Sequence, residues 1–315
     1  MLGLLYIVLS SIFFGFSNAY WKKAIQNTPF LQVIFMRGLY TTSFFGLFYL
    51  LDLRWGIFEP WLGALPDFSV EQLGVSFGLC IFSAFGLFFF VRTLKTEAVS
   101  LVAPISSINV FGLLTAVLFF GDSWGFKQTS AILCVLVGLF FIFRSQWQFA
   151  KMSSFWKALG GSILASFFWG VSYSLFRFPI HWLGVLPFTF LLELCVTLFV
   201  GLLLVSQKQS WQRIPQRPIQ VLALCIILGS IFLHISYQSA SVTQIIFIGK
   251  SQLVLTLFFG HLLYREKLTY LQMLGVFFFN SIYLFSRLIR SSSLNNSSSQ
   301  TPPEGEGGVK SKSDF

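Results

Sequence analysis

The segment LGLLYIVLSSIFFGFSNAYW, residues 2–21, decides the fold, because it carries no charge over a length that crosses the hydrocarbon core of a bilayer. Comparable apolar segments follow it along the chain. They lack the alternation of apolar and polar residues that marks the strands of a membrane barrel. We therefore predict an all-α polytopic membrane protein.

The composition of the 315-residue chain agrees with this prediction. Hydrophobic residues make up 55% and charged residues only 10%, and the mean hydropathy is +0.76. A soluble protein is usually about a quarter charged. The net charge is +10, but the 21 Lys and Arg residues are scattered singly between apolar runs. We expect them at the membrane interface, with the lipid bilayer as partner and no nucleic acid.

Ten apolar spans are expected, and five in each half make two repeats. The predicted domains are a first repeat at 1–150, a second at 151–290 and a disordered Ser/Gly-rich tail at 291–315. A boundary uncertainty of a few residues is usual. The spans are Leu2–Trp21, Phe30–Leu51, Gln72–Val91, Val99–Phe120, Thr129–Phe143, Phe155–Leu175, Val185–Ser206, Gln220–Gln238, Val242–Tyr264 and Thr269–Phe285.

The two repeats share short motifs in the same order. Five spans are an odd number, so the second repeat must enter the membrane upside down relative to the first. Inverted repeats of this kind are the plan of many secondary transporters. The matching pairs are Phe13-Phe14-Gly15-Phe16-Ser17 with Phe168-Trp169-Gly170-Val171-Ser172, Thr28-Pro29-Phe30 with Leu186-Pro187-Phe188, and Gly121-Asp122 with Arg265-Glu266.

Spans 1 and 6 each place small and polar residues on one helical face that ends in a cation. The faces are Ser11, Gly15, Asn18 and Lys22 in span 1, and Ser166, Gly170, Tyr173 and Arg177 in span 6. The steps of four and three residues follow the helical period. Close helix packing, with the cations reaching the interface, explains such faces as well as a shared cavity does.

Three charged residues lie deeper: Arg37 in span 2, Glu193 in span 7 and Lys250 in span 9. Each costs about 2.5–3.5 kcal/mol at a helix centre on insertion scales, so each is a candidate functional residue. Arg37 and Glu193 alternatively form a structural salt bridge. Lys250 alternatively pairs with Glu193 or extends to the interface.

Other candidates are weaker. Trp169 and Tyr173 are suited to stacking on a substrate, and Ser251 lies beside Lys250. His234 is more simply read as a packing residue than as a proton relay. The four cysteines show no metal-ligand spacing. The chain has no His-Glu-x-x-His, no intramembrane aspartate pair and no Gly-x-Ser-x-Gly, so we expect no enzyme, no metal and no cofactor.

The doubled motifs and the acidic residues that close spans 4 and 9 resemble the EamA family of the drug/metabolite transporter superfamily. The resemblance covers residues 1 to about 288 and includes Leu268-Thr269-x-Leu271-Gln272-x-Leu274-Gly275. It implies a ten-helix carrier of small metabolites, with the substrate in a central cavity between the halves. The sequence departs from the family at Asp122, where Glu is usual, and at Arg265, where Gly is usual.

The functional hypothesis is a secondary transporter in the cell (inner) membrane that moves a small anionic or zwitterionic metabolite, such as an amino acid or nucleotide-type derivative, by alternating access. The predicted substrate-binding residues are Lys250, Arg37, Glu193, Asn18, Tyr173, Ser251, Trp169, Lys22 and Arg177. A coupling proton or counter-substrate stays open, as does the orientation of the termini. The alternative is a non-transporting membrane scaffold or receptor with the same fold.

Overall fold

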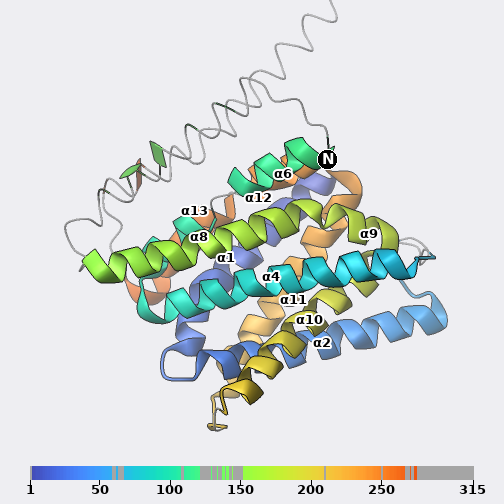
Figure 1. Ribbon diagram of the computed structural model, residues 1–315, viewed down its shortest axis with the longest axis horizontal. Helices are drawn as coiled ribbons and strands as arrows, with labels where there is room; N and C mark the ends of the chain where they lie inside the picture. The colour runs from blue at the N-terminus through green and yellow to red at the C-terminus, as the bar shows by residue number, and fades with distance from the viewer. Residues whose placement is uncertain are drawn as a thin grey trace, which may run out of the picture.

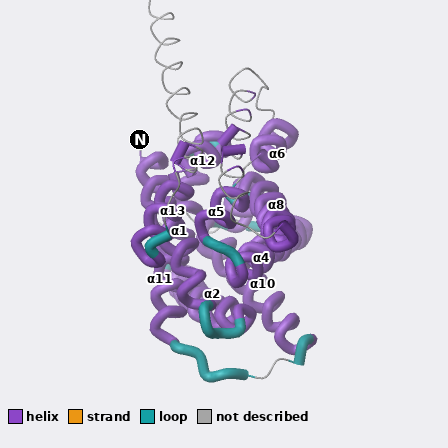
Figure 2. The backbone as a smooth tube through the Cα atoms, turned by 90° about the vertical axis from the view of Figure 1, so that its left-hand side faces the viewer, coloured by secondary structure: helices purple, strands orange, loops and turns teal. Residues whose placement is uncertain are grey.

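The computed structural model describes residues 2–58, 62, 67–107, 110–120, 129, 133, 137–138, 140–141, 144, 152–208, 211–249, 251–266, 270 and 273–274. Within these residues the chain consists of helices and connecting loops and contains no strand (Figure 2). The helices are α1 (Leu2–Ile25), α2 (Phe30–Trp55), α4 (Val70–Thr96), α5 (Val99–Ser106), α6 (Val110–Phe120), α8 (Met152–Leu175), α9 (Arg177–Leu183), α10 (Val185–Ser206), α11 (Gln216–Ser239), α12 (Val242–Gly249) and α13 (Ser251–Tyr264).

Eight helical stretches of the described residues are long and apolar enough to cross a membrane. Each coincides with one predicted span, and the stretch 99–120 comprises α5 and α6. Most residues of the other two predicted spans, Thr129–Phe143 and Thr269–Phe285, lie outside the described residues, and the predicted tail lies wholly outside them. The all-helical class is thus confirmed, while the total of ten spans stays a prediction.

Large apolar side chains point outward from these helices. Leu118, Leu202 and Val205 are 78%, 71% and 78% exposed. Apolar surface on this scale is unfavourable in water and favourable against lipid chains. These are the features of a multi-pass membrane protein.

Several helix ends have recognisable local causes. Ser69 and Gln72 form a capping box at the start of α4, in which Ser69 Oγ accepts from the Gln72 N–H at 3.2 Å and Gln72 Oε1 accepts from the Ser69 N–H at 2.9 Å. Gly56 ends α2 with φ 60°, a conformation that glycine adopts without steric cost. Gly184, with φ 86°, separates α9 from α10.

The most extensive helix contacts join the two predicted repeats. Helix α1 packs on α11 and α13, α4 packs on α8, and α2 packs on α10. Figure 1 shows α4 and α8 side by side along the molecule, with α10 and α2 on the other side of α4. The principal buried core likewise takes residues from both repeats, including Ile34, Leu94, Val200 and Leu253. The halves are therefore interleaved.

These contacts map onto one another when the two halves are exchanged. In the two repeats, α1 corresponds to α8, α11 to α4 and α13 to α6. The contact of α1 with α11 then becomes that of α8 with α4, and the contact of α1 with α13 becomes that of α8 with α6; all four contacts are present. This equivalence supports the duplicated unit read from the sequence.

Two glycines at equivalent positions show the same correspondence between the repeats at the level of single residues. A Cβ added to Gly15 on α1 would lie 2.6 Å from Leu255 Cβ on α13. A Cβ added to Gly170 on α8 would lie 3.1 Å from Phe111 Cβ on α6. Both distances are below an ordinary contact, so glycine is what lets each helix pair approach so closely.

Candidate functional site

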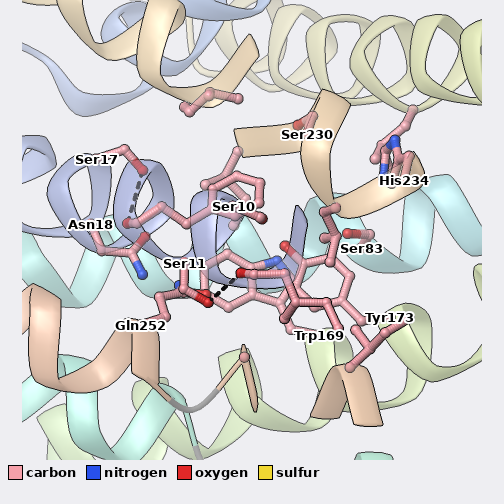
Figure 3. A pocket seen from close by; sticks show the side chains of 18 of the residues that line it. Ser10, Ser11, Ser17, Asn18, Ser83, Trp169, Tyr173, Ser230, His234 and Gln252 are labelled. Carbon is pink, nitrogen blue, oxygen red and sulfur yellow. Dashed lines mark hydrogen bonds between the residues drawn. The ribbon is translucent and has the colours of Figure 1, made fainter. Parts of the chain in front are cut away.

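A cavity of about 150 Å³ lies between the two halves. Its wall is formed by α1, α2 and α4 from the first half and by α8, α10, α11, α12 and α13 from the second. Figure 3 shows side chains from several of these helices around it. Its polar lining residues are Ser10, Ser11, Ser17, Asn18, Arg37, Ser83, Tyr173, Ser174, Glu193, Ser230, His234, Tyr237 and Gln252.

Helix α1 supplies a row of hydroxyl and amide groups to this wall. Ser11 Oγ donates to the Ile7 carbonyl at 2.8 Å, and Ser17 Oγ donates to the Phe14 carbonyl at 3.1 Å (Figure 3). A serine that gives its hydrogen to its own helix keeps oxygen lone pairs for a ligand. Since Gly15 on the same helix packs against α13, the predicted face of span 1 serves both packing and lining.

An ion pair between Arg37 and Glu193 stands at the cavity wall. Arg37 Nη1 donates to Glu193 Oε2, and Thr41 Oγ1 donates to the same oxygen at 2.7 Å. The side chains of Arg37 and Glu193 are 2% and 5% exposed. The Arg37 guanidinium carbon also lies 5.8 Å from the centre of the Trp21 ring. Of the two alternatives read from the sequence, the structure therefore contains the salt bridge, and it lines a cavity.

Aromatic rings from α8 form another part of the wall. Trp169 and Tyr173 stack with ring centres 6.1 Å apart and an angle of 12° between their planes. Tyr237 on α11 fixes this turn of α8, because its hydroxyl donates to the Tyr173 carbonyl. A planar pair of this kind offers a stacking surface to a solute in the cavity.

Of the predicted site residues that the structure describes, three are not among those that line the cavity. Lys22 lies at the end of α1, Arg177 is exposed at the start of α9, and Ser251 Oγ donates to the Ile248 carbonyl at 2.8 Å. Lys250 lies outside the described residues. The structure thus brings together Asn18, Arg37, Trp169, Tyr173 and Glu193. A substrate-binding role for any of the nine stays a prediction.

Lys22 pairs instead with Glu266, just after α13. Lys22 Nζ lies 3.4 Å from Glu266 Oε1. The same carboxylate accepts from the backbone N–H groups of Val99 and Ser100, at 3.3 and 3.0 Å. Glu266, from the second half, therefore joins the end of α1 to the start of α5, both of which belong to the first half. A carboxylate is favourable there, because the N-terminus of a helix carries partial positive charge.

Sequence reasoning missed part of the wall, and it assigned His234, which belongs to that part, to helix packing. Ser230, His234 and Tyr237 on α11 line the cavity at steps of four and three residues. The polar face of span 1 has the same spacing. A search for polar residues at steps of three and four along span 8 therefore finds these three residues. Ser83 on α4 and Gln252 on α13 carry no comparable signal, because isolated polar residues of these types are common in packed membrane helices.

The described residues hold no group of three or more His, Cys, Asp or Glu side chains that could bind a metal ion. What the cavity does offer is hydrogen-bonding groups, aromatic rings and one ion pair. Such a pocket is suited to reversible binding of a small polar molecule.

Comparisons with known proteins give a family and a fold. The model of the EamA-like transporter family matches residues 1–144 and 156–286, one match for each half. No curated protein matches the chain. Among solved structures, one titled only as a crystal structure of a protein superposes with a TM-score of 0.66 at 12% identity. That match covers 91% of this chain and 96% of the other, and it supports the fold alone.

Proposed function

Because this chain belongs to the EamA-like transporter family, we propose that it is a secondary transporter that moves a small anionic or zwitterionic metabolite through the cavity between its halves. An amino acid or a nucleotide-type derivative has the required chemistry. The observation that carries the proposal is the cavity to which both repeats contribute, with the Arg37–Glu193 pair and several hydroxyl groups in its wall. The proposed location is the cell (inner) membrane.

The mechanism we propose is alternating access by rocking of two inverted five-helix repeats in a ten-helix protein. The contact of α1 with α11 and the equivalent contact of α8 with α4 support this mechanism. Repeats that pack in near-equivalent ways can exchange the side of the membrane on which the cavity is open. In this mechanism the Glu266 contacts, which join α1 and α5, would break and form as one end of the cavity opens and closes. A coupling proton or a counter-substrate would supply the driving force.

The charges of the cavity wall support a solute that carries charge itself. Arg37 and Glu193 present both signs at one place, which suits a zwitterion. We keep Lys250 as the residue that binds a carboxylate or phosphate, because its described neighbours Gly249 and Gln252 line the cavity. Lys22 and Arg177 would attract the solute at the rims of the pathway.

The test is binding followed by uptake. A thermal-shift screen of small metabolites against the purified protein identifies ligands, since a ligand that binds the folded state raises its stability. Uptake of each hit into proteoliposomes is then compared between the wild type, Lys250→Ala and Asn18→Ala. Lys23→Ala is the control, because Lys23 is exposed and is not among the residues that line the cavity. Full uptake by both test variants would remove these residues from the site.

The second candidate is a non-transporting scaffold or receptor with this fold. The Arg37–Glu193 pair favours it, because a structural pair needs no substrate. Cysteines introduced at Asn18, Tyr173 and Ser251 separate the two candidates. A carrier exposes these positions to a water-soluble thiol reagent from one side of the membrane or the other, whereas a scaffold leaves them unlabelled from both sides.

A further inference from the structure

A hydrogen-bond chain runs from α10 to a cavity-lining histidine on α11. Thr189 Oγ1 donates to the Val185 carbonyl at 2.6 Å and also lies 2.6 Å from His234 Nδ1. Both side chains are buried, and His234 lines the cavity one turn from Ser230 (Figure 3). The rings of Phe176 and Phe188 pack around the imidazole, with centres 6.2 and 5.3 Å away. The histidine is therefore held in one orientation.

This chain determines which nitrogen of His234 carries the hydrogen. A hydroxyl has one hydrogen, and Thr189 gives its own to Val185. Thr189 can then only accept from His234, so the hydrogen of the neutral imidazole is on Nδ1. Nε2 is left as a bare acceptor. It has no hydrogen-bond partner among the described residues.

An unpaired donor belongs to the same cavity. Arg37 donates a hydrogen bond from Nη1 to Glu193, but its buried Nε has no partner within the described part of the chain. A buried polar group without a partner costs about 1–3 kcal/mol, so native structures usually supply one from the protein, water or a ligand. Two residues of the cavity wall thus keep an unpaired group among the described residues: Arg37 has a buried donor at Nε, and His234 has an acceptor at Nε2.

We propose that His234 is a specificity-determining residue that accepts a hydrogen bond from an O–H or N–H group of the transported solute. Thr189 is its positioning residue. This inference rests on the proposed transport function and narrows its substrate class to solutes that carry a hydrogen-bond donor apart from their charged groups. A site built around such a bond rejects an analogue that lacks the donor.

The first test reads the state of His234 without any solute. The full chain is labelled with ¹⁵N-histidine, and His234→Gln identifies the signal among the three histidines of the chain. The expected spectrum is that of a neutral ring with its hydrogen on Nδ1.

Thr189→Val should abolish the preference of the hydrogen for Nδ1, because valine cannot accept a hydrogen bond. Thr197→Val is the matched control on the same helix, since Thr197 bonds to Glu193 and Thr42 and not to histidine. A hydrogen on Nε2 in the wild type, or no response to Thr189→Val, would overturn the assignment.

The second test compares solutes that differ by one donor. The probes are serine with alanine, tyrosine with phenylalanine, and adenosine 5′-monophosphate with purine riboside 5′-monophosphate, measured by thermal shift and titration. For the pair that binds, the donor-bearing member should bind the wild type about tenfold more tightly, as expected for one hydrogen bond. His234→Phe should remove this difference, and His234→Gln, whose amide oxygen is still an acceptor, should retain part of it.

The outcomes of the second test separate the two proposals. The role of His234 is contradicted if the wild type binds both members of a pair equally tightly, or if His234→Phe keeps the difference in affinity. Either result leaves the proposed transport function standing. Absence of binding by all six probes contradicts the proposed function for these solute classes, while the nitrogen spectrum still decides the state of His234. An unchanged melting temperature of His234→Gln shows that loss of binding does not reflect loss of folding.

Discussion

At the scale of single residues, the decisive feature is that the deepest described charges neutralise one another. Arg37 and Glu193 come from helices of different repeats and meet at the cavity wall, with Thr41 sharing the carboxylate. Removing two charges from water costs several kcal/mol each, and the pair recovers this only through close contact and added hydrogen bonds. The pair therefore couples the integrity of the cavity to the packing of α2 against α10.

Removal of one partner of this pair should destabilise the protein strongly. Arg37→Met leaves the Glu193 carboxylate buried without its cation, so we expect a loss of about 3–5 kcal/mol. The double variant Arg37→Met/Glu193→Leu should be closer to the wild type than either single variant. Thermal or denaturant unfolding in detergent measures these differences. The control is Arg177→Met, an exposed arginine, for which a change within about 0.5 kcal/mol is expected. Additive effects of the two single changes would contradict the pairing.

At the scale of helices, close approach across the two halves depends on glycine. Gly170→Ala puts a methyl group against Phe111 and the Gly112 backbone, and we expect a loss of about 1–3 kcal/mol. Gly15→Ala, its equivalent in the repeat, should lose a similar amount against Leu255. Gly160→Ala on the same helix is the control, because nothing lies within 4 Å of the added methyl. Melting temperatures in detergent measure all three, and a loss at Gly160 equal to that at Gly170 would show that contact between helices is not the cause.

The Glu266 contacts make a second prediction at this scale. Glu266→Ala removes the Lys22 pair and the acceptor for two N–H groups of α5, so the contact between α1 and α5 at this end should weaken. A surface ion pair contributes at most about 1 kcal/mol, whereas a cap adds about 1 kcal/mol more. We therefore expect Glu266→Ala to cost about 1–2 kcal/mol and Lys22→Met less.

Thiol labelling tests whether this contact also closes the cavity. In a background without the four native cysteines, Asn18→Cys should react faster with a water-soluble reagent when Glu266→Ala is added. Lys23→Ala, which lies beside the contact and takes no part in it, should leave the rate unchanged. Equal rates with and without Glu266 would mean that this end is closed by apolar packing alone.

At the scale of the whole molecule, the two repeats are interleaved and depend on each other. Helix α1 has its main contacts with α11 and α13, and α4 has its main contact with α8. A repeat produced alone would expose those surfaces, including the small and polar face of α1, to lipid. Neither half holds the cavity by itself, because both contribute to its wall.

Separation of the halves should therefore abolish folding unless both are present. We expect residues 1–150 and 151–315, produced as two chains in the same cell, to copurify and to unfold in a single transition. Each half alone should aggregate or be degraded. Copurification through a tag on one half, with the melting curve of the pair, is the measurement. A monodisperse half that melts cooperatively by itself would contradict the interleaved arrangement.

The sequence by itself determined the membrane class, the positions of eight helices and the doubled motif around Gly15 and Gly170. These properties are local: an uncharged run of about 20 residues favours a membrane helix whatever lies beside it. The same local reasoning marked Arg37 and Glu193 as exceptional, because a charge in an apolar span is costly wherever its partner lies.

Only the tertiary structure decided which side chains meet. It paired Arg37 with Glu193, which are 156 positions apart, and Lys22 with Glu266, which are 244 positions apart. It also brought His234 on α11 to Thr189 on α10 at the wall of the cavity. Helical periodicity orders residues along one face of one helix. It contains no information about which helix of the other repeat lies opposite that face, and every contact of the site depends on that choice.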